Sequence, residues 1–135
     1  MAEQIFGTLH PFFEGGPVYG RKVANEGFMS ELLRQDPFDR YHFYLQDADG
    51  FMEQLSKRSD LASLRAVRRG AVQAWHRQKL LQDIREIPFA CMHLSDPVTE
   101  YTALCSLRNS EAGRLFPVTC LNHTLDYLDY PMCFL

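Results

Sequence analysis

The sequence lacks several short motifs that mark common classes of enzyme. It contains no G-x-G-x-x-G run, no G-x-S-x-G run, and no two histidines four residues apart with a glutamate between them. A dinucleotide-binding turn, a serine nucleophile elbow and a hydrolytic zinc helix depend on those spacings. We therefore expect no metal site and no cofactor.

Closely spaced cysteines and long apolar runs are also missing. The four cysteines, at positions 91, 105, 120 and 133, form no C-x-x-C pair. Cys91 and Cys120 stand in apolar runs typical of buried strands, so we interpret them as small core residues rather than metal ligands or disulfide partners. This usage favours a reducing, cytoplasmic setting. No stretch approaches the roughly 18 consecutive apolar residues of a membrane-spanning helix.

An excess of basic charge is absent too. The chain has 14 Lys and Arg against 17 Asp and Glu, a net charge of −3, which argues against nucleic acid as the main partner. Basic residues do gather in the middle third, at Lys57, Arg58, Arg65, Arg68, Arg69, Arg77 and Lys79. Because Asp60 and Asp83 interrupt them, we interpret this cluster as a solvated surface. Peripheral membrane association of a longer parent protein stays open.

The length of 135 residues corresponds to one domain. A domain of this size buries about two-thirds of its unfolded surface and needs no disulfide or metal. Residues 130–135 read Y-P-M-C-F-L, an apolar end where domains usually carry solvated residues. We therefore expect residues 1–135 to form a single Rossmann-like domain within a longer protein.

Short apolar runs alternate with stretches of helical periodicity along the chain. This alternation predicts an α/β fold, in which an open, Rossmann-like parallel sheet of about five strands carries helices on both faces. The predicted strands cover residues 5–9, 41–45, 61–67, 89–94 and 117–121. The predicted helices cover residues 21–33, a short segment capped by Asp47 or Asp49, and residues 71–87 and 97–108. In the first helix, Ala24, Phe28 and Leu32, with Met29 and Leu33 beside them, form the expected apolar stripe.

A glycine-rich loop, P-F-F-E-G-G-P-V-Y-G at residues 11–20, separates the first predicted strand from the first predicted helix. Gly15 and Gly16 let the backbone approach a ligand closely, and the helix start behind them offers free N–H groups to an anion. This arrangement suits a phosphate group. A sharp turn without a ligand is the alternative interpretation.

Polar residues follow three of the predicted strands at their carboxyl ends. His10 follows the first strand, Ser95 and Asp96 the fourth, and His123 and Thr124 the fifth. In an open parallel sheet these ends lie at one edge, and ligands bind where the strand order reverses. We therefore predict a ligand site there, with His123 as its strongest candidate. Asp96 has the alternative role of capping the helix that Pro97 begins.

Three segments resemble the amino-terminal domain of GT-B fold glycosyltransferases, and most closely the large retaining group called glycosyltransferase family 4. They are the loop E-G-G-P-V-Y-G, the segment F-A-C-M-H-L-S-D-P at residues 89–97, and the segment F-P-V-T-C-L-N-H-T-L-D-Y at residues 116–127. In that family the glycine-rich loop faces the donor phosphates, and a histidine after the last of these strands reaches toward the donor sugar. The resemblance extends over residues 5–127.

The resemblance implies a hexosyltransferase-like enzyme that transfers a sugar from a nucleotide-sugar donor to an acceptor, with retention. His123 would be the catalytic residue, and the donor phosphates or the substrate would be bound by Gly15, Gly16, Asp96, Thr124 and His10. Enzymes of this family bind the nucleotide-sugar mainly in a second, carboxy-terminal domain. Residues 1–135 would then be the acceptor-side half, inactive alone.

Two positions depart from the family pattern. Thr124 follows His123 where the family usually has an aspartate, so the details of the sugar contact are open. Pro17 lies within the glycine-rich loop and has no N–H to contribute to a phosphate cradle.

The alternative function is a non-catalytic, flavodoxin-like module that binds a phosphorylated ligand or a protein partner. A flavin-binding loop would use hydroxyl side chains, which residues 14–17 lack, and a receiver domain would have acidic residues in place of His10 and Pro11. A GT-B relative that epimerises sugars stays open as well.

In the longer enzyme that the resemblance implies, we predict that His123→Ala lowers activity far more than stability. The imidazole would act on the substrate only after the two domains close, and would add little to the folded core. Transfer assays and urea unfolding of the same variant measure the two effects. Equal losses of both would place His123 in the core instead.

Overall fold

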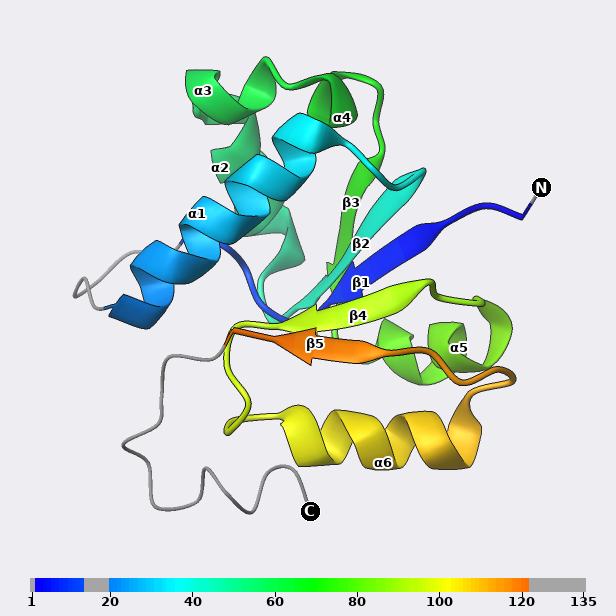
Figure 1. The fold of residues 1–135 in the computed structure, drawn as a ribbon. Helices are drawn as coiled ribbons and strands as arrows, with labels where there is room; N and C mark the ends of the chain where they lie inside the picture. The colour runs from blue at the N-terminus through cyan, green and yellow to red at the C-terminus, as the bar shows by residue number, and fades with distance from the viewer. Residues whose placement is uncertain (1, 14–19, 122–135) are drawn as a thin grey trace.

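The computed structural model describes residues 2–13 and 20–121, whose chain path is shown in Figure 1. The strands are β1 (Ile5–Thr8), β2 (Arg40–Leu45), β3 (Val72–His76), β4 (Cys91–Leu94) and β5 (Val118–Cys120). They form one sheet in the order β3-β2-β1-β4-β5, with every neighbouring pair parallel. The predicted α/β fold with an open, Rossmann-like parallel sheet is thereby confirmed.

Helices connect the strands and cover both faces of the sheet. They are α1 (Gly20–Gln35), α2 (Ala48–Lys57), α3 (Ser59–Ala62), α4 (Arg65–Arg68), α5 (Lys79–Glu86) and α6 (Tyr101–Glu111). The first four lie on one side of the sheet, and α5 and α6 lie on the other (Figure 1). This division follows from right-handed crossovers, because the chain runs outward from β1 in one direction and from β4 in the other. In the described part of the chain, no helix combines the length and the apolarity that crossing a membrane would take.

Side chains of the central strands alternate between two buried clusters, one on each side of the sheet. Phe6 of β1 and Phe43 of β2 pack in the cluster under α1 to α4. Ile5 of β1 and Tyr44 of β2 pack in the cluster over α5 and α6. A strand covered on both faces needs apolar side chains at nearly every position, which is why these strands read as almost continuous apolar runs.

The inward face of α1 is only part of the predicted apolar stripe, shifted toward Met29 and Leu33. Met29 and Leu33 are buried, whereas Phe28 of the predicted stripe remains 38% exposed. The buried row starts with a polar residue, Asn25, whose Nδ2 donates to the Pro11 carbonyl at 3.4 Å. Hydropathy alone therefore centred the stripe on Phe28, whereas the buried side is centred on Met29.

The predicted third strand, residues 61–67, is also wrong. This segment forms the two short helices α3 and α4, which bury Leu61 and Ala66 and leave their arginines at the surface. The chain then turns at Gly70, whose φ of 75° suits glycine best, and enters β3.

The third strand lies inside the segment predicted as the helix 71–87. Val72 and Trp75 are three residues apart, a spacing that fits one face of a helix but equally fits opposite faces of a strand. Pairing with β2, from Tyr41 beside Val72 to Leu45 beside His76, satisfies the backbone here. The helix itself begins only at Lys79.

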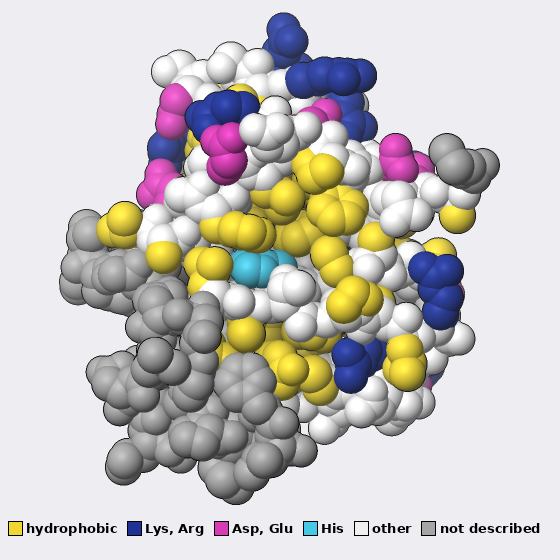
Figure 2. All heavy atoms as spheres, viewed as in Figure 1, with side chains coloured by type: hydrophobic (Ala, Val, Ile, Leu, Met, Phe, Trp, Pro, Cys, Tyr) yellow, Lys and Arg dark blue, Asp and Glu magenta, His cyan; other side chains and the backbone are white. Residues whose placement is uncertain are grey.

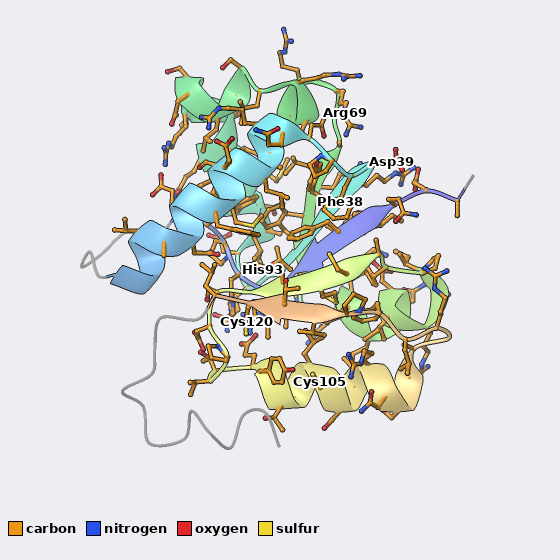
Figure 3. The ribbon with its side chains drawn as sticks, in the orientation of Figure 1. Phe38, Asp39, Arg69, His93, Cys105 and Cys120 are labelled. Atoms are coloured by element: carbon orange, nitrogen blue, oxygen red, sulfur yellow. The ribbon has the colours of Figure 1, made fainter. Side chains whose placement is uncertain are left out.

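One arginine fastens the loop between α1 and β2 at the amino-terminal edge of the sheet (Figure 3). Arg69, which directly follows α4, donates to the Asp36 carboxylate at 2.8 Å and to the carbonyls of Phe38 and Asp39 at 2.9 and 2.8 Å. Asp36 has a φ of 50°, in the left-handed region that aspartate tolerates better than most residues. The predicted end of the first helix at Asp36-Pro37 is confirmed.

Part of the sheet has no helix over it among the described residues, namely the α1 side of β4 and β5 (Figure 1). Hydrophobic side chains gather across this region in Figure 2, which has the same view. His93 of β4 lies here, and the Phe28 ring stacks on it with the centroids 4.4 Å apart. Its Nδ1 lies 2.9 Å from the Thr119 hydroxyl of β5.

Two histidines are buried on opposite faces of the sheet. His42 is 3% exposed and His93 is 2% exposed. Burial lowers the pKa of each from 6.5 to about 4, because the charged imidazolium loses its hydration. Both rings are therefore neutral at neutral pH.

We predict that stability falls as the pH drops from 6.5 to about 4. In this window the unfolded histidines take up protons and the buried ones do not, so the unfolded state is favoured by up to roughly 3 kcal/mol per residue. His93→Phe, which keeps an aromatic ring under Phe28, should reduce the slope. His76→Gln, at an exposed histidine of β3, is the matched control and should leave the slope unchanged. Urea unfolding followed by circular dichroism measures both; an unaltered slope in His93→Phe would contradict the assignment.

Candidate functional site

A pocket of about 390 Å³ opens at the carboxyl ends of the strands. Its polar lining comes from four connections: His10 after β1, Gln46 and Asp47 after β2, Arg77 after β3, and Ser95, Thr99 and Glu100 after β4. β1 and β4 are neighbours in the sheet, and the chain leaves them in opposite directions. The pocket thus lies at the point where the strand order reverses, the usual ligand position in this architecture.

His10 links the ends of β1 and β4. Its Nδ1 accepts a hydrogen bond from the backbone N–H of Ser95 at 3.0 Å, and the Ser95 Oγ lies 3.0 Å from the same atom. Because a backbone N–H can only donate, Nδ1 carries the lone pair, and the proton of the neutral ring is on Nε2. Nε2 lies 3.5 Å from Glu100 Oε2, a distance too long for a strong hydrogen bond, so the contact is mainly electrostatic.

Arg77 joins this group from the end of β3. Its Nη1 donates to Glu100 Oε1, and its Nη2 donates to the carbonyl of Leu9 at 2.9 Å. One guanidinium thereby connects the segments that follow β1, β3 and β4. Arg77 Nε is buried and has no hydrogen-bond partner among the described residues.

Glu100 is the acidic member of the group, and its side chain is 24% exposed. The contact with the His10 imidazole, and then the Arg77 guanidinium, hold the pKa of this carboxyl below its ordinary value of 4.5, against the opposing effect of burial. At neutral pH the pocket is therefore lined by a charged carboxylate beside an arginine that it already neutralises.

Asp96 shapes the turn between β4 and α6. Its Oδ1 accepts from the backbone N–H groups of Val98 and Thr99, both at 2.8 Å, and the Thr99 hydroxyl donates to the same carboxylate at 2.7 Å. α6 begins only at Tyr101, with Glu100 at its N-cap position. The prediction that Asp96 caps this helix is thus wrong: its amide partners, Val98 and Thr99, lie in a turn that precedes the helix, so the carboxylate caps an Asx-type turn instead.

Asp47 and Gln46 form the side of the pocket that follows β2. Asp47 caps α2, since its carboxylate accepts from the backbone N–H of Gly50 at 3.0 Å. Of the two predicted caps for this helix, Asp47 is therefore the one used. Gln46 precedes it and is exposed.

The predicted site residues are only partly within the described chain. His10 lines the pocket, and Asp96 lies behind it as the 1% exposed centre of the 97–99 turn. Four lie outside the described residues: Gly15, Gly16, His123 and Thr124.

Several pocket residues were missed in the sequence. Arg77 was missed because its strand was predicted as helix, and Glu100 because the helix after β4 was predicted to start too early. Gln46 directly follows a correctly predicted strand, so its position at the carboxyl edge was a usable signal.

The arrangement suits hydrogen bonding to a polar ligand. Carboxylate, hydroxyl, amide and imidazole groups lie around one cavity, and together they can both donate and accept. Among residues 2–13 and 20–121, no three His, Cys, Asp or Glu side chains are grouped to hold a metal ion.

Comparisons with known protein families, with curated proteins and with solved structures found no match to this chain. The pocket is therefore interpreted from its own geometry and chemistry.

We predict that Glu100→Gln destabilises the protein by about 1–3 kcal/mol at neutral pH, because it removes the charge that Arg77 and His10 face. Glu100 has a lowered pKa, so its stabilisation is complete above the ordinary value of 4.5 and is lost as the pH falls through the folded-state value. The difference between wild type and variant should accordingly shrink below that pH.

Urea midpoints across the pH range in which the protein folds measure this difference. Glu111→Gln is the matched control, since Glu111 pairs with Arg85 at the surface, and it should change stability by less than about 0.5 kcal/mol. A Glu100→Gln effect independent of pH would mean that packing, and not charge, is responsible.

Proposed function

We propose that this chain is the acceptor-binding domain of a glycosyltransferase, and that the pocket between the ends of β1 and β4 holds the sugar acceptor. The observation that supports this most is the convergence of hydrogen-bonding side chains from four strand ends on one cavity. Sugar hydroxyls donate and accept at once, so they match a lining that mixes acceptors such as Asp47 and Glu100 with donors such as Arg77 and Gln46.

The resemblance to glycosyltransferase family 4 supports the same proposal from the sequence. The donor, a nucleotide-sugar, would be bound mainly by a second domain across the cleft from this one. His123 would contact the donor sugar, and the amides at Gly15 and Gly16 would stabilise the negative charge that develops on the leaving nucleoside diphosphate. Catalysis would then depend on positioning and on charge stabilisation.

The pocket residues of this chain would place the acceptor for that reaction. His10 and Ser95 are held by each other, and Glu100 is held by Arg77, so a hydroxyl bound there would meet groups that are already oriented. The reaction would be hexosyl transfer with retention of configuration. It would take place in a reducing, cytoplasmic setting. Cys91, Cys105 and Cys120 form no disulfide among the described residues, which is compatible with that setting.

The 135 residues alone should bind an acceptor but not turn over a nucleotide-sugar. Sugar transfer by the isolated chain would contradict the proposal that a second domain is needed to bind the donor. Capture of a protein partner without any binding of sugars would favour the non-catalytic, flavodoxin-like alternative.

We predict that Gln46→Ala weakens binding of neutral saccharides to the isolated chain about fivefold, the loss of roughly one hydrogen bond. Gln46 is exposed, so the fold should be unaffected. NMR titration with neutral mono- and disaccharides measures the dissociation constant and reports whether the amides of Ser95 and Thr99 shift. Gln54→Ala, at an exposed glutamine of α2 outside the pocket lining, is the matched control. Equal affinities for both variants would remove Gln46 from the site.

A further inference from the structure

Helix α2 starts at the pocket, and a carboxylate of the protein itself occupies its positive end. α2 has ten residues and begins beside the cavity. A free N-terminus of this kind attracts phosphate, because its first N–H groups are unpaired and the helix dipole is positive there. Here the carboxylate of Asp47 accepts from the Gly50 N–H at 3.0 Å and fills that position. A ligand anion would have to compete with a fixed carboxylate.

The turn after β4 repeats this arrangement. The N–H groups of Val98 and Thr99 point at one centre, as they would in an anion-binding turn. That centre is the Asp96 carboxylate, at 2.8 Å from both nitrogens, and it also accepts the Thr99 hydroxyl. Asp96 is 1% exposed, so neither of these two amides is available to a ligand in the pocket.

The arginine that lines the pocket is neutralised as well. Arg77 pairs with Glu100 through Nη1 and with the Leu9 carbonyl through Nη2. Its Nε is buried, and the second N–H on each Nη belongs to a guanidinium whose charge Glu100 already balances. Against this one paired cation, the lining carries two carboxylates, those of Asp47 and Glu100, which repel an anion at short range.

We infer that the pocket binds a polyhydroxylated ligand without an anionic group, a sugar with no phosphate, sulfate or carboxylate at the end that enters the cavity. This inference rests on the proposed function, because it names the class of acceptor that the same site takes. The specificity comes from charge: the lining carries two carboxylates against one paired guanidinium. The start of α6 has no side-chain cap, but Glu100 at its N-cap position places one of those carboxylates there, while hydroxyls can still hydrogen-bond to the lining.

The test is an NMR titration of the 135-residue chain with three probes: methyl glucoside, glucose 6-phosphate and inorganic phosphate. We expect the neutral glycoside to shift the amides of Gln46, Ser95 and Thr99. Glucose 6-phosphate should bind about threefold to tenfold more weakly, and addition of salt should narrow that gap.

Asp47→Asn separates charge from structure. Asparagine caps a helix about as well as aspartate, so the variant keeps α2 and loses one negative charge at the pocket. It should reduce the ratio of the dissociation constants for glucose 6-phosphate and the neutral glycoside about threefold. Asp49→Asn, in the first turn of the same helix but outside the pocket lining, is the matched control and should leave both affinities unchanged.

The outcomes distinguish the inference from the function on which it rests. Tighter binding of glucose 6-phosphate than of the neutral glycoside at the same amides would overturn the inference and leave a carbohydrate site in place. Binding of inorganic phosphate at those amides would overturn it too. If no sugar shifts them, the proposed function fails and the inference fails with it.

Discussion

β1 pairs with β2 on one side and with β4 on the other, and the rest of the structure depends on that central position. The chain leaves β1 toward α1 and leaves β4 toward α6, so the two connections diverge on opposite faces of the sheet. Nothing in the strand pairing itself fills the space between them. The side chains at these two strand ends, His10 and Ser95, are therefore the ones that border the pocket.

The contacts from Ser95 through His10 and Glu100 to Arg77 then fix the shape of that space. They join segments that follow three different strands, so each loop limits the movement of the others. Charged groups cost free energy when they are partly removed from water, and a purely structural tie could be made from apolar residues. These charged groups lie at the mouth of a cavity, where a ligand can reach them. That position fits a polar binding site.

A buried charge alone does not mark a site, as Asp83 shows. This carboxylate of α5 is 3% exposed and accepts hydrogen bonds from the Tyr44 hydroxyl at 2.7 Å and from Lys79 at 3.0 Å. Burial, and then the bond to Asp83, raise the pKa of Tyr44. Tyr44 belongs to the core cluster over α5 and α6, and its bond to Asp83 attaches α5 to the sheet without lining the pocket. Position at the carboxyl edge, rather than burial, distinguishes the pocket residues.

The parts of the fold that the sequence could predict are those where one pattern dominates. β1, β2 and β4 are apolar on both faces, and a helix cannot place such short runs against two different cores at once. β3 is an edge strand whose half-buried Gln73 and Trp75 permit a helical spacing. Only its pairing with β2, a contact between segments about 30 residues apart, decides its structure, and no local pattern contains that information.

The errors in the elements explain the errors in the site. With residues 71–87 taken as one helix, Arg77 falls in the middle of a helix, where nothing distinguishes it from its neighbours. With a helix starting at Pro97, Glu100 becomes one more residue of the first turn. Once β3 ends at His76 and α6 starts at Tyr101, both residues move to the carboxyl edge beside His10, which was predicted there because β1 was. In this fold a residue's function at that edge is set by where its strand or helix stops, so a shift of three or four residues in a boundary is enough to hide half of a binding site.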